Sequence, residues 1–213
     1  MHLMDVPLHF NFVEASLQGN EYDLRRILDN ALINDTPLLA ITFVDNHDTQ
    51  PLQSLESPVE YWFKPHSYAI TLLREAGIPC IFFPSLYGAK YSGKNSEGNE
   101  VTIELIGVPE LHIMLKARAH KAYGLQRDYF DHHNTVGWTR EGDSEHPGSG
   151  LAVLLTNGES GNKSMEMGKA HAGKTFVDIY GNREERVTIN EDGWGEFFVN
   201  ERSVSIWICE ENS

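Results

Sequence analysis

The first half of the chain alternates between apolar patterns typical of strands and of helices. Residues 3–12 have apolar residues at alternate positions, and residues 37–46 and 79–83 form near-continuous apolar runs. Such runs are typical of strands buried on both faces of a parallel sheet. Apolar residues at helical spacing define three expected helices, at residues 22–32, 59–75 and 109–123. The pattern therefore predicts three β–α units in residues 1–123.

A polar segment separates the third expected strand from the last expected helix. Residues 84–108 are rich in Gly, Ser, Asn and Glu. A connection of this length is unusual between packed elements and is commonly either functional or disordered. We therefore expect a long loop here.

The pattern changes after Gly124. Short β-like runs recur at residues 129–133, 136–141, 151–156, 175–179, 186–189, 195–199 and 203–209. Between them lie turn residues such as Asn157-Gly158 and Asp192-Gly193, which tolerate positive φ. This spacing predicts an antiparallel Greek-key sandwich in residues 124–213 that folds by itself.

Three parallel strands alone leave two open sheet edges. A (β/α)₈ barrel needs eight units and about 250 residues, and open edges favour association between chains. We therefore expect residues 1–123 to be the last three β–α units of a larger barrel. Without that barrel, Ile41, Phe43, Ile81 and Phe82 are expected to promote self-association.

Composition and charge exclude some classes of partner. Asp and Glu outnumber Lys and Arg by 31 to 17, for a formal net charge of −14. Nucleic-acid binding depends on clustered cations, so we expect no nucleic-acid partner. We see no signal peptide and no apolar stretch of the ~20 residues that span a bilayer, so no membrane association is expected. Cys80 and Cys209 have apolar flanks and are expected to be free, buried thiols.

Several segments resemble the α-amylase family of glycoside hydrolases. Residues 43–51, FVDNHDTQP, resemble the family's fourth signature region, which ends the seventh barrel strand. Further similarity to the sixth strand, the seventh helix, the eighth strand and the β-domain occurs at residues 4–9, 62–75, 78–84, 129–133, 137–140 and 193–197. The resemblance implies a partial (β/α)₈ barrel followed by a β-sandwich, and is greatest for liquefying and cytoplasmic-type bacterial enzymes.

The resemblance also implies roles for three consecutive residues. Asp48 matches the carboxylate that stabilises the oxocarbenium-like transition state of retaining hydrolysis. His47 matches a donor to sugar hydroxyls, and Asn46 would shape the same subsite. All three follow a predicted barrel strand, where such barrels build active sites. The alternative interpretation is a strand-end turn with capping side chains.

The implied activity is hydrolysis of internal α-1,4-glucosidic bonds in starch or glycogen, in the cytoplasm. The family's nucleophile and general acid follow the fourth and fifth strands, and we find no matching motif in these 213 residues. We therefore expect the isolated chain to be inactive. The alternative is a non-catalytic module that binds a glucan or a protein partner.

Calcium is the metal that the resemblance implies for the family. One site joining the barrel to the β-domain matches Asn20, Tyr22, His133, Asn134 and Asn157. Relatives carry carboxylates at the last two positions, so calcium binding here is expected to be weak or absent. His132-His133 is not expected to be a metal site. Trp138, Trp194 and Trp207 are expected to pack in the core rather than stack on sugars.

Overall fold

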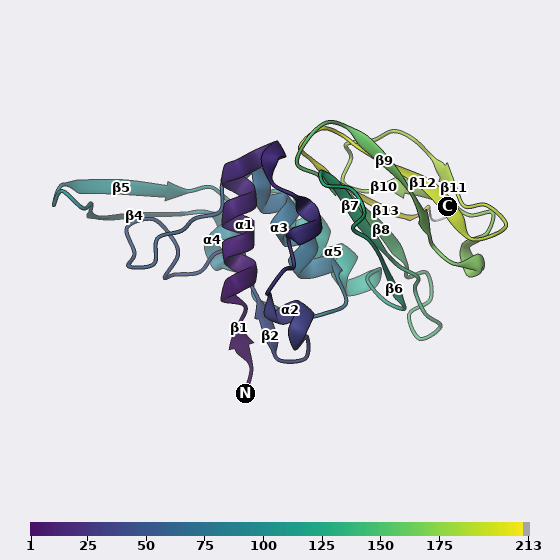
Figure 1. Cartoon of the computed structure of the whole chain (residues 1–213), viewed down its shortest axis with the longest axis horizontal. Helices are drawn as coiled ribbons and strands as arrows, with labels where there is room; N and C mark the ends of the chain where they lie inside the picture. The colour runs from purple at the N-terminus through teal and green to yellow at the C-terminus, as the bar shows by residue number, and fades with distance from the viewer. Residues whose placement is uncertain (211–213) are drawn as a thin grey trace.

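Three short parallel strands organise the N-terminal half of the molecule. The computed structural model describes residues 1–210 of the chain. β1 (Leu3–Met4), β2 (Ala40–Thr42) and β3 (Ile78–Pro79) pair in the order β1-β2-β3. All three run parallel because helices connect them, as predicted (Figure 1).

The first connection differs from the sequence prediction. The expected strand over residues 3–12 ends at Met4, and α1 (Val6–Gln18) begins directly after it. Asp5 caps α1 by accepting a hydrogen bond from Leu8 N at 3.2 Å, and Pro7 occupies the first turn. Leu8 and Phe12 are buried at helical spacing. Capping and periodicity together therefore favour a helix over the alternation of the first few residues.

The helix expected over residues 22–32 is also wrong. A 3₁₀ turn, η1 (Gly19–Glu21), is followed by another, η2 (Leu24–Arg26), and by the single-turn α2 (Leu32–Asp35). Asn30 has a φ of 56°, which is incompatible with a continuous right-handed helix. The Asp5 carboxylate accepts hydrogen bonds from Leu32 N and Ile33 N, so this segment folds around a buried acceptor.

The remaining helices agree with expectation, but the predicted loop does not. η3 (Tyr61–Phe63) leads into α3 (Lys64–Leu73), and α5 (Leu111–His120) packs beside it. The strand expected over residues 79–83 is confirmed only at Pro79, and the short α4 (Phe83–Tyr87) begins at its last residue. Residues 84–108 contain an antiparallel hairpin, β4 (Ala89–Lys94) and β5 (Glu100–Leu105), which projects from the molecule (Figure 1). Its second strand alternates polar and apolar residues, a signal for a strand that composition concealed.

The C-terminal half is an antiparallel β-sandwich, as predicted. One sheet has the order β11-β10-β13-β8-β7-β6, and the other pairs β12 with β9. The strands are β6 (Gln126–Tyr129), β7 (Thr135–Arg140), β8 (Leu151–Thr156), β9 (Gly161–Glu166), β10 (Thr175–Asp178), β11 (Val187–Thr188), β12 (Trp194–Val199) and β13 (Val204–Cys209). A 3₁₀ turn, η4 (Lys169–His171), precedes β10. The sequence prediction missed β9, because this strand has few apolar residues. Its exposed polar residues alternate with more buried ones.

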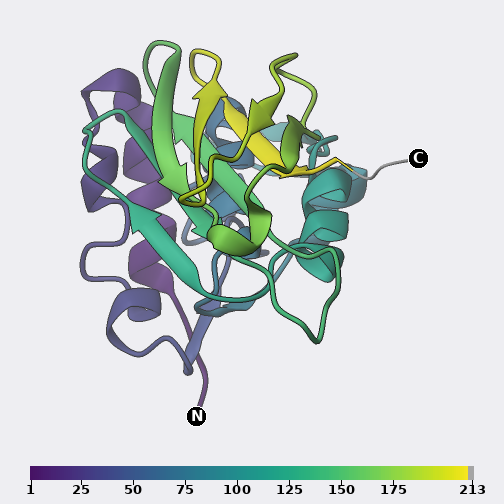
Figure 2. The same cartoon turned by 90° about the vertical axis from the view of Figure 1, so that its right-hand side faces the viewer.

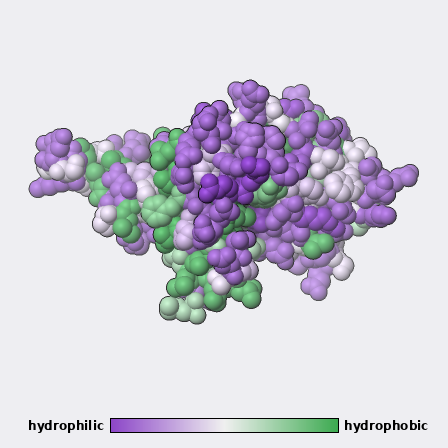
Figure 3. Space-filling view, viewed as in Figure 1, coloured by the Kyte–Doolittle hydropathy of each residue, from purple (hydrophilic) through white to green (hydrophobic). Residues whose placement is uncertain are grey.

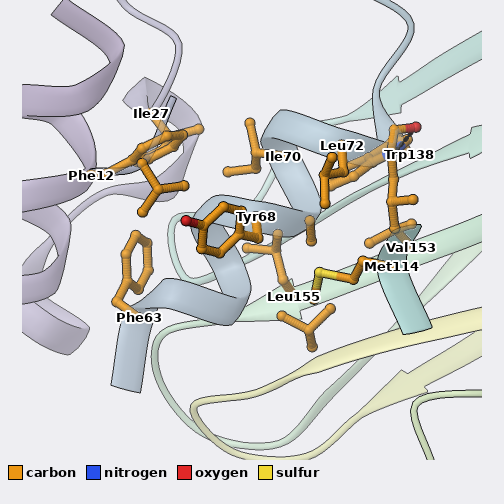
Figure 4. Packing of buried hydrophobic residues seen from close by; sticks show 14 of the residues in the cluster. Phe12, Ile27, Phe63, Tyr68, Ile70, Leu72, Met114, Trp138, Val153 and Leu155 are labelled. Carbon is orange, nitrogen blue, oxygen red and sulfur yellow. Dashed lines mark hydrogen bonds between the residues drawn. The ribbon is translucent and has the colours of Figure 1, made fainter. Parts of the chain in front are cut away.

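The two halves share one hydrophobic core. Tyr68 and Leu72 of α3 and Met114 of α5 belong to the same buried cluster as Trp138 and Val153 of the sandwich (Figure 4). The larger sheet therefore packs one face on the helices and the other on the β9–β12 sheet, and Figure 2 shows the sandwich in front of the helices. The boundary at residues 123/124 stays a prediction, but the packing across it is continuous.

Two of the three tryptophans lie in the core as expected, but the cysteines do not. Trp138 and Trp207 are fully buried, whereas Trp194 is 36% exposed at the start of β12. Both cysteines are free, as expected, but neither is buried. Cys80 is exposed because it directly follows β3, an edge strand with no neighbour on its outer side among residues 1–210.

Candidate functional site

The loop after β2 carries the three residues that the resemblance singles out. The side-chain oxygen of Asn46 accepts hydrogen bonds from Asp48 N at 2.9 Å and Thr49 N at 3.0 Å. The Asn46 N–H in turn donates to Thr49 Oγ1 at 3.0 Å. These bonds form an Asx turn that reverses the chain a few residues after β2. Asn46 therefore fixes the backbone on which the next two side chains stand.

His47 and Asp48 point outward from this turn. Their side chains are 80% and 49% exposed, and His47 Nε2 lies 3.4 Å from Asp48 Oδ1. None of the turn's hydrogen bonds uses either side chain, because Asn46 and Thr49 supply them. A carboxylate and an imidazole are thus presented side by side, available to a polar ligand.

A buried ion pair holds the loop from below. Lys64 Nζ lies 2.6 Å from Asp45 Oδ2, with the two side chains 15% and 4% exposed. Asp45 Oδ1 also accepts a hydrogen bond from Val59 N at 3.2 Å. Asp45 therefore ties the beginning of the loop to its end and to the start of α3. Sequence reasoning missed this pair, although a carboxylate directly after a buried strand and a lysine at a helix start are visible signals.

His9 supports the same loop from α1. Its ring stacks on Phe43 with centroids 5.1 Å apart, and its Nδ1 lies 2.6 Å from Val44 O. Its Nε2 lies 3.0 Å from Ser57 Oγ, at the far end of the loop. Burial lowers the pKa of His9, which favours a neutral ring at neutral pH. His9 was not predicted, and the resemblance had assigned its neighbourhood to a strand.

The projecting hairpin contacts the loop from the other side. Tyr91 of β4 donates a hydrogen bond from its hydroxyl to Pro51 O at 2.6 Å. Leu52 packs against Gly93, where an added Cβ would lie 3.1 Å from the Leu52 side chain. A cavity of about 50 Å³ is lined in part by Asp45, Pro51 and Lys64. It has room for water.

The residues of the expected calcium site do come together. The Asn134 amide nitrogen donates to Asn20 O and to Asn157 Oδ1, both at 2.8 Å. The Asn157 amide nitrogen donates to Gly19 O and Tyr22 O, again at 2.8 Å. The carbonyl of His133 accepts from Leu24 N at 2.7 Å. The residues present offer N–H groups where a calcium ion requires oxygen ligands, so this set does not fit the metal.

Of the adjacent histidines His132 and His133, the first shapes a turn. His132 and His133 lie in the bend after β6 rather than in a strand, and their ring centroids are 4.5 Å apart. His132 Nδ1 accepts hydrogen bonds from Asn134 N and Thr135 N, both at 3.2 Å, and so shapes the turn. Within residues 1–210, no group of three or more His, Cys, Asp or Glu side chains could hold a metal ion.

No helix in the described part of the chain has the length and apolar character that crossing a membrane requires. This finding concerns residues 1–210 alone.

Comparison with known proteins finds similar sequences over most of the chain. The family model described as "Alpha-amylase C-terminal" matches residues 151–208. The chain is 51% identical to the α-amylase of Bacillus licheniformis over 210 residues, covering 97% of this chain and 39% of that protein. The chain corresponds to the C-terminal part of bacterial α-amylases. It is also 44% identical to the cytoplasmic α-amylase of Escherichia coli (strain K12), over 98% of this chain and 42% of that protein.

Solved α-amylase structures share the fold. A complex of α-amylase I from Eisenia fetida with maltohexaose superimposes with a TM-score of 0.66 at 13% identity, covering 99% of this chain and 49% of that one. An α-amylase from Anoxybacillus matches with a TM-score of 0.65 at 13% identity, over 100% of this chain and 48% of that one. The chain spans about two fifths of the length of its curated α-amylase relatives.

Proposed function

We propose that this chain forms the C-terminal part of an α-amylase that hydrolyses internal α-1,4-glucosidic bonds of starch or glycogen with retention of configuration. In this proposal β1, β2 and β3 are the last three strands of a (β/α)₈ barrel. The supporting observation is the position of His47 and Asp48, exposed on a turn at the carboxyl end of a parallel strand. Active sites of such barrels are built at that end.

Asp48 is the proposed transition-state stabiliser. Cleavage of a glycosidic bond develops positive charge on the sugar ring, and a fixed carboxylate beside that ring lowers the energy of the charged state. The turn made by Asn46 fixes the Asp48 backbone, so little reorganisation is needed during the reaction. His47, exposed beside it, donates hydrogen bonds to hydroxyls of the same sugar.

In this proposal residues 1–213 supply neither the nucleophile nor the general acid. Retaining hydrolysis requires both groups, separated by about 5–5.5 Å across the scissile bond. The resemblance assigns them to barrel strands that precede the ones matched here. A polypeptide of residues 1–213 alone is therefore expected to bind glucan weakly and to cleave none.

A chimeric enzyme tests the proposal directly. The N-terminal three fifths of the Bacillus licheniformis α-amylase are fused to Met1–Ser213, and starch hydrolysis is measured beside the unfused chain. The chimera is expected to be active and the unfused chain inactive. Asp48→Asn in the chimera is expected to reduce kcat by about 10³-fold or more, because the carboxylate acts mainly on the transition state.

The control variant is Asp35→Asn, which makes the same chemical change at an exposed position of α2. It should leave kcat within about twofold, since surface substitutions away from such sites have small effects. An active Asp48→Asn chimera would refute the role of Asp48. Starch cleavage by the pure 213-residue chain would refute the proposal that the nucleophile and the general acid come from other residues. Retention of that chain in a starch-containing native gel, with an inactive chimera, would favour the alternative of a glucan-binding module.

The proposal also includes a cytoplasmic location. It is supported by the 44% identity to the relative from Escherichia coli that is named a cytoplasmic α-amylase. Fractionation of the native organism, with activity or antibody detection, tests it.

A further inference from the structure

The segment after α1 meets the sandwich through two asparagine side chains. Asn157, at the end of β8, is fully buried, and Asn134 lies half-buried before β7. Opposite them are the backbone carbonyls of Gly19, Asn20 and Tyr22, which belong to η1 and the residue that follows it. The contact joins positions more than one hundred residues apart in the sequence.

Every amide hydrogen of the two asparagines is used in this contact. Each side-chain NH₂ group has two hydrogens. Those of Asn157 go to Gly19 O and Tyr22 O, and those of Asn134 go to Asn20 O and Asn157 Oδ1. The four donor–acceptor distances are all 2.8 Å. The orientation of both amides follows from this network, because a flipped amide would bring its oxygen against carbonyl oxygens.

We propose that Asn134 and Asn157 form a metal-free clamp that fastens the α/β half to the sandwich, with amide hydrogens in the place of a cation. The carbonyl oxygens of Gly19 and Tyr22, which accept from the same amide nitrogen, repel one another unless positive charge lies between them. A divalent cation can supply that charge, and so can the positive ends of N–H bonds. Here three N–H groups supply it to the carbonyls of Gly19, Asn20 and Tyr22, and the fourth joins the two asparagines.

The clamp excludes calcium by its own chemistry. Calcium requires six to eight oxygen ligands at about 2.3–2.6 Å. The amide nitrogens direct their hydrogens at the oxygens of this contact, where they would repel a cation. The nearby His133 carbonyl is also engaged, since it accepts from Leu24 N at 2.7 Å. Calcium could bind only after both amides had turned and given up their hydrogen bonds.

Thermal melting of the full chain with and without calcium tests the clamp. Wild type is compared with Asn134→Asp/Asn157→Asp, with Asn157→Ala and with Asn162→Asp. The last variant makes the same change at an exposed position of β9, close to the same surface, and serves as the control. Each protein is stripped with a chelator and then melted in chelator and in a series of CaCl₂ concentrations, and calcium binding is measured by isothermal titration calorimetry.

In chelator, the double variant should melt at least about 5 °C below wild type and below Asn162→Asp, because carboxylates would face carbonyl oxygens without donors. Calcium should raise its melting temperature progressively, since two carboxylates and three carbonyls are ligands that the ion prefers. Calcium should change the melting temperatures of wild type and Asn162→Asp equally. The heat of calcium binding should be the same for wild type and Asn157→Ala.

Two outcomes would overturn the proposal. The first is a calcium-dependent rise in the wild-type melting temperature that Asn157→Ala abolishes, because the asparagines would then bind the metal. The second is a melting temperature of Asn134→Asp/Asn157→Asp equal to wild type in chelator, because the amide hydrogens would then contribute nothing. If the double variant fails to fold in chelator, the single variant Asn134→Asp, at the half-exposed end of the clamp, provides the same comparison.

Discussion

His66 shows how a single buried residue sets the response of the fold to pH. It lies on α3, stacked on Phe63 with centroids 4.8 Å apart, and its Nε2 lies 2.9 Å from Thr156 O. It therefore joins the helix to the end of β8. Burial lowers the pKa of His66 from 6.5 to about 4. The folded protein thus holds this ring neutral where an unfolded chain would already protonate it.

Stability is expected to fall on acidification through this residue. The contribution of His66 is fully present above pH 6.5 and is lost as the pH falls toward 4, because the unfolded state takes up the proton first. The slope is about 1.4 kcal/mol per pH unit for one proton. Urea unfolding of wild type and His66→Gln at several pH values between 7.5 and 4 measures it. His66→Gln should show a shallower dependence, and equal slopes would contradict the assignment.

The candidate site was only partly predictable at the residue scale. Asn46, His47 and Asp48 stand in one short motif, so similarity could single them out, and the structure explains Asn46 as the Asx-turn residue. Asp45 supports the loop by pairing with Lys64, and His9 supports it by contacting Ser57. These partners are separated by 19 and 48 positions in the sequence, respectively. No local pattern encodes such partners. Tertiary contacts therefore decided which polar residues became buried supports.

At the level of elements, capping residues and tertiary contacts determined the secondary structure where local apolar patterns predicted another. Residues 3–12 alternate like a strand, but Asp5 and Pro7 begin a helix there. Residues 22–32 have helical spacing, but Asn30 turns the chain with a φ of 56°. The hairpin of residues 89–105 was expected as a loop because its composition is polar, although its second strand alternates correctly. Elements with long, uninterrupted patterns, such as α3 and β8, were predicted well.

The hairpin is expected to steady the site loop without stabilising the whole fold. Tyr91→Phe removes the hydrogen bond to Pro51 O, which contributes about 1 kcal/mol. Amide exchange in residues 50–57 should then accelerate about fivefold, while the melting temperature changes little, because the hairpin projects from the core (Figure 1). Hydrogen exchange followed by mass spectrometry measures the exchange in residues 50–57, and thermal unfolding measures the melting temperature.

Tyr87→Phe is the matched control for this experiment. Tyr87 is 67% exposed on α4 and packs its ring near Phe83. The control should leave exchange in residues 50–57 unchanged. Equal exchange in wild type and Tyr91→Phe would show that the loop is held by Asp45 and His9 alone.

At the scale of the whole molecule, one core joins the two halves, and the expectation that residues 124–213 fold alone stays a prediction. One face of the six-stranded sheet is covered by α3 and α5, so Trp138, Val153 and Leu155 are buried by residues before the boundary (Figure 4). An isolated sandwich would expose this face to water, at a cost of roughly 25 cal/mol per Å² of apolar surface. The periodicity of strands locates a sheet, but it does not say whether a partner covers its second face.

The other end of the molecule leaves apolar surface uncovered. Leu3, Leu38, Leu39 and Ile78 are 46%, 85%, 41% and 45% exposed around the parallel sheet. Figure 3 shows hydrophobic surface gathered there, over β1 and the segment before β2. The earlier expectation named other residues, but Phe43 is buried beneath His9, and Ile41, Ile81 and Phe82 are half-buried. β1 and β3 are the edge strands of this sheet. Apolar surface beside unpaired strand edges favours association between copies.

A polypeptide of residues 1–213 is therefore expected to self-associate, and salt should strengthen the association. With a formal net charge of −14, copies repel at low ionic strength. Salt shortens the screening length to about 8 Å at 0.15 M and about 3 Å at 1 M. Sedimentation velocity at several protein and salt concentrations should show larger species as either rises. Leu38→Lys/Ile78→Lys should restore the monomer, whereas Leu125→Lys, an equal change at a 59% exposed leucine of the other half, should not. A monomer under all conditions would mean that the exposed edges do not drive association, since screening removes the repulsion that could otherwise hide it.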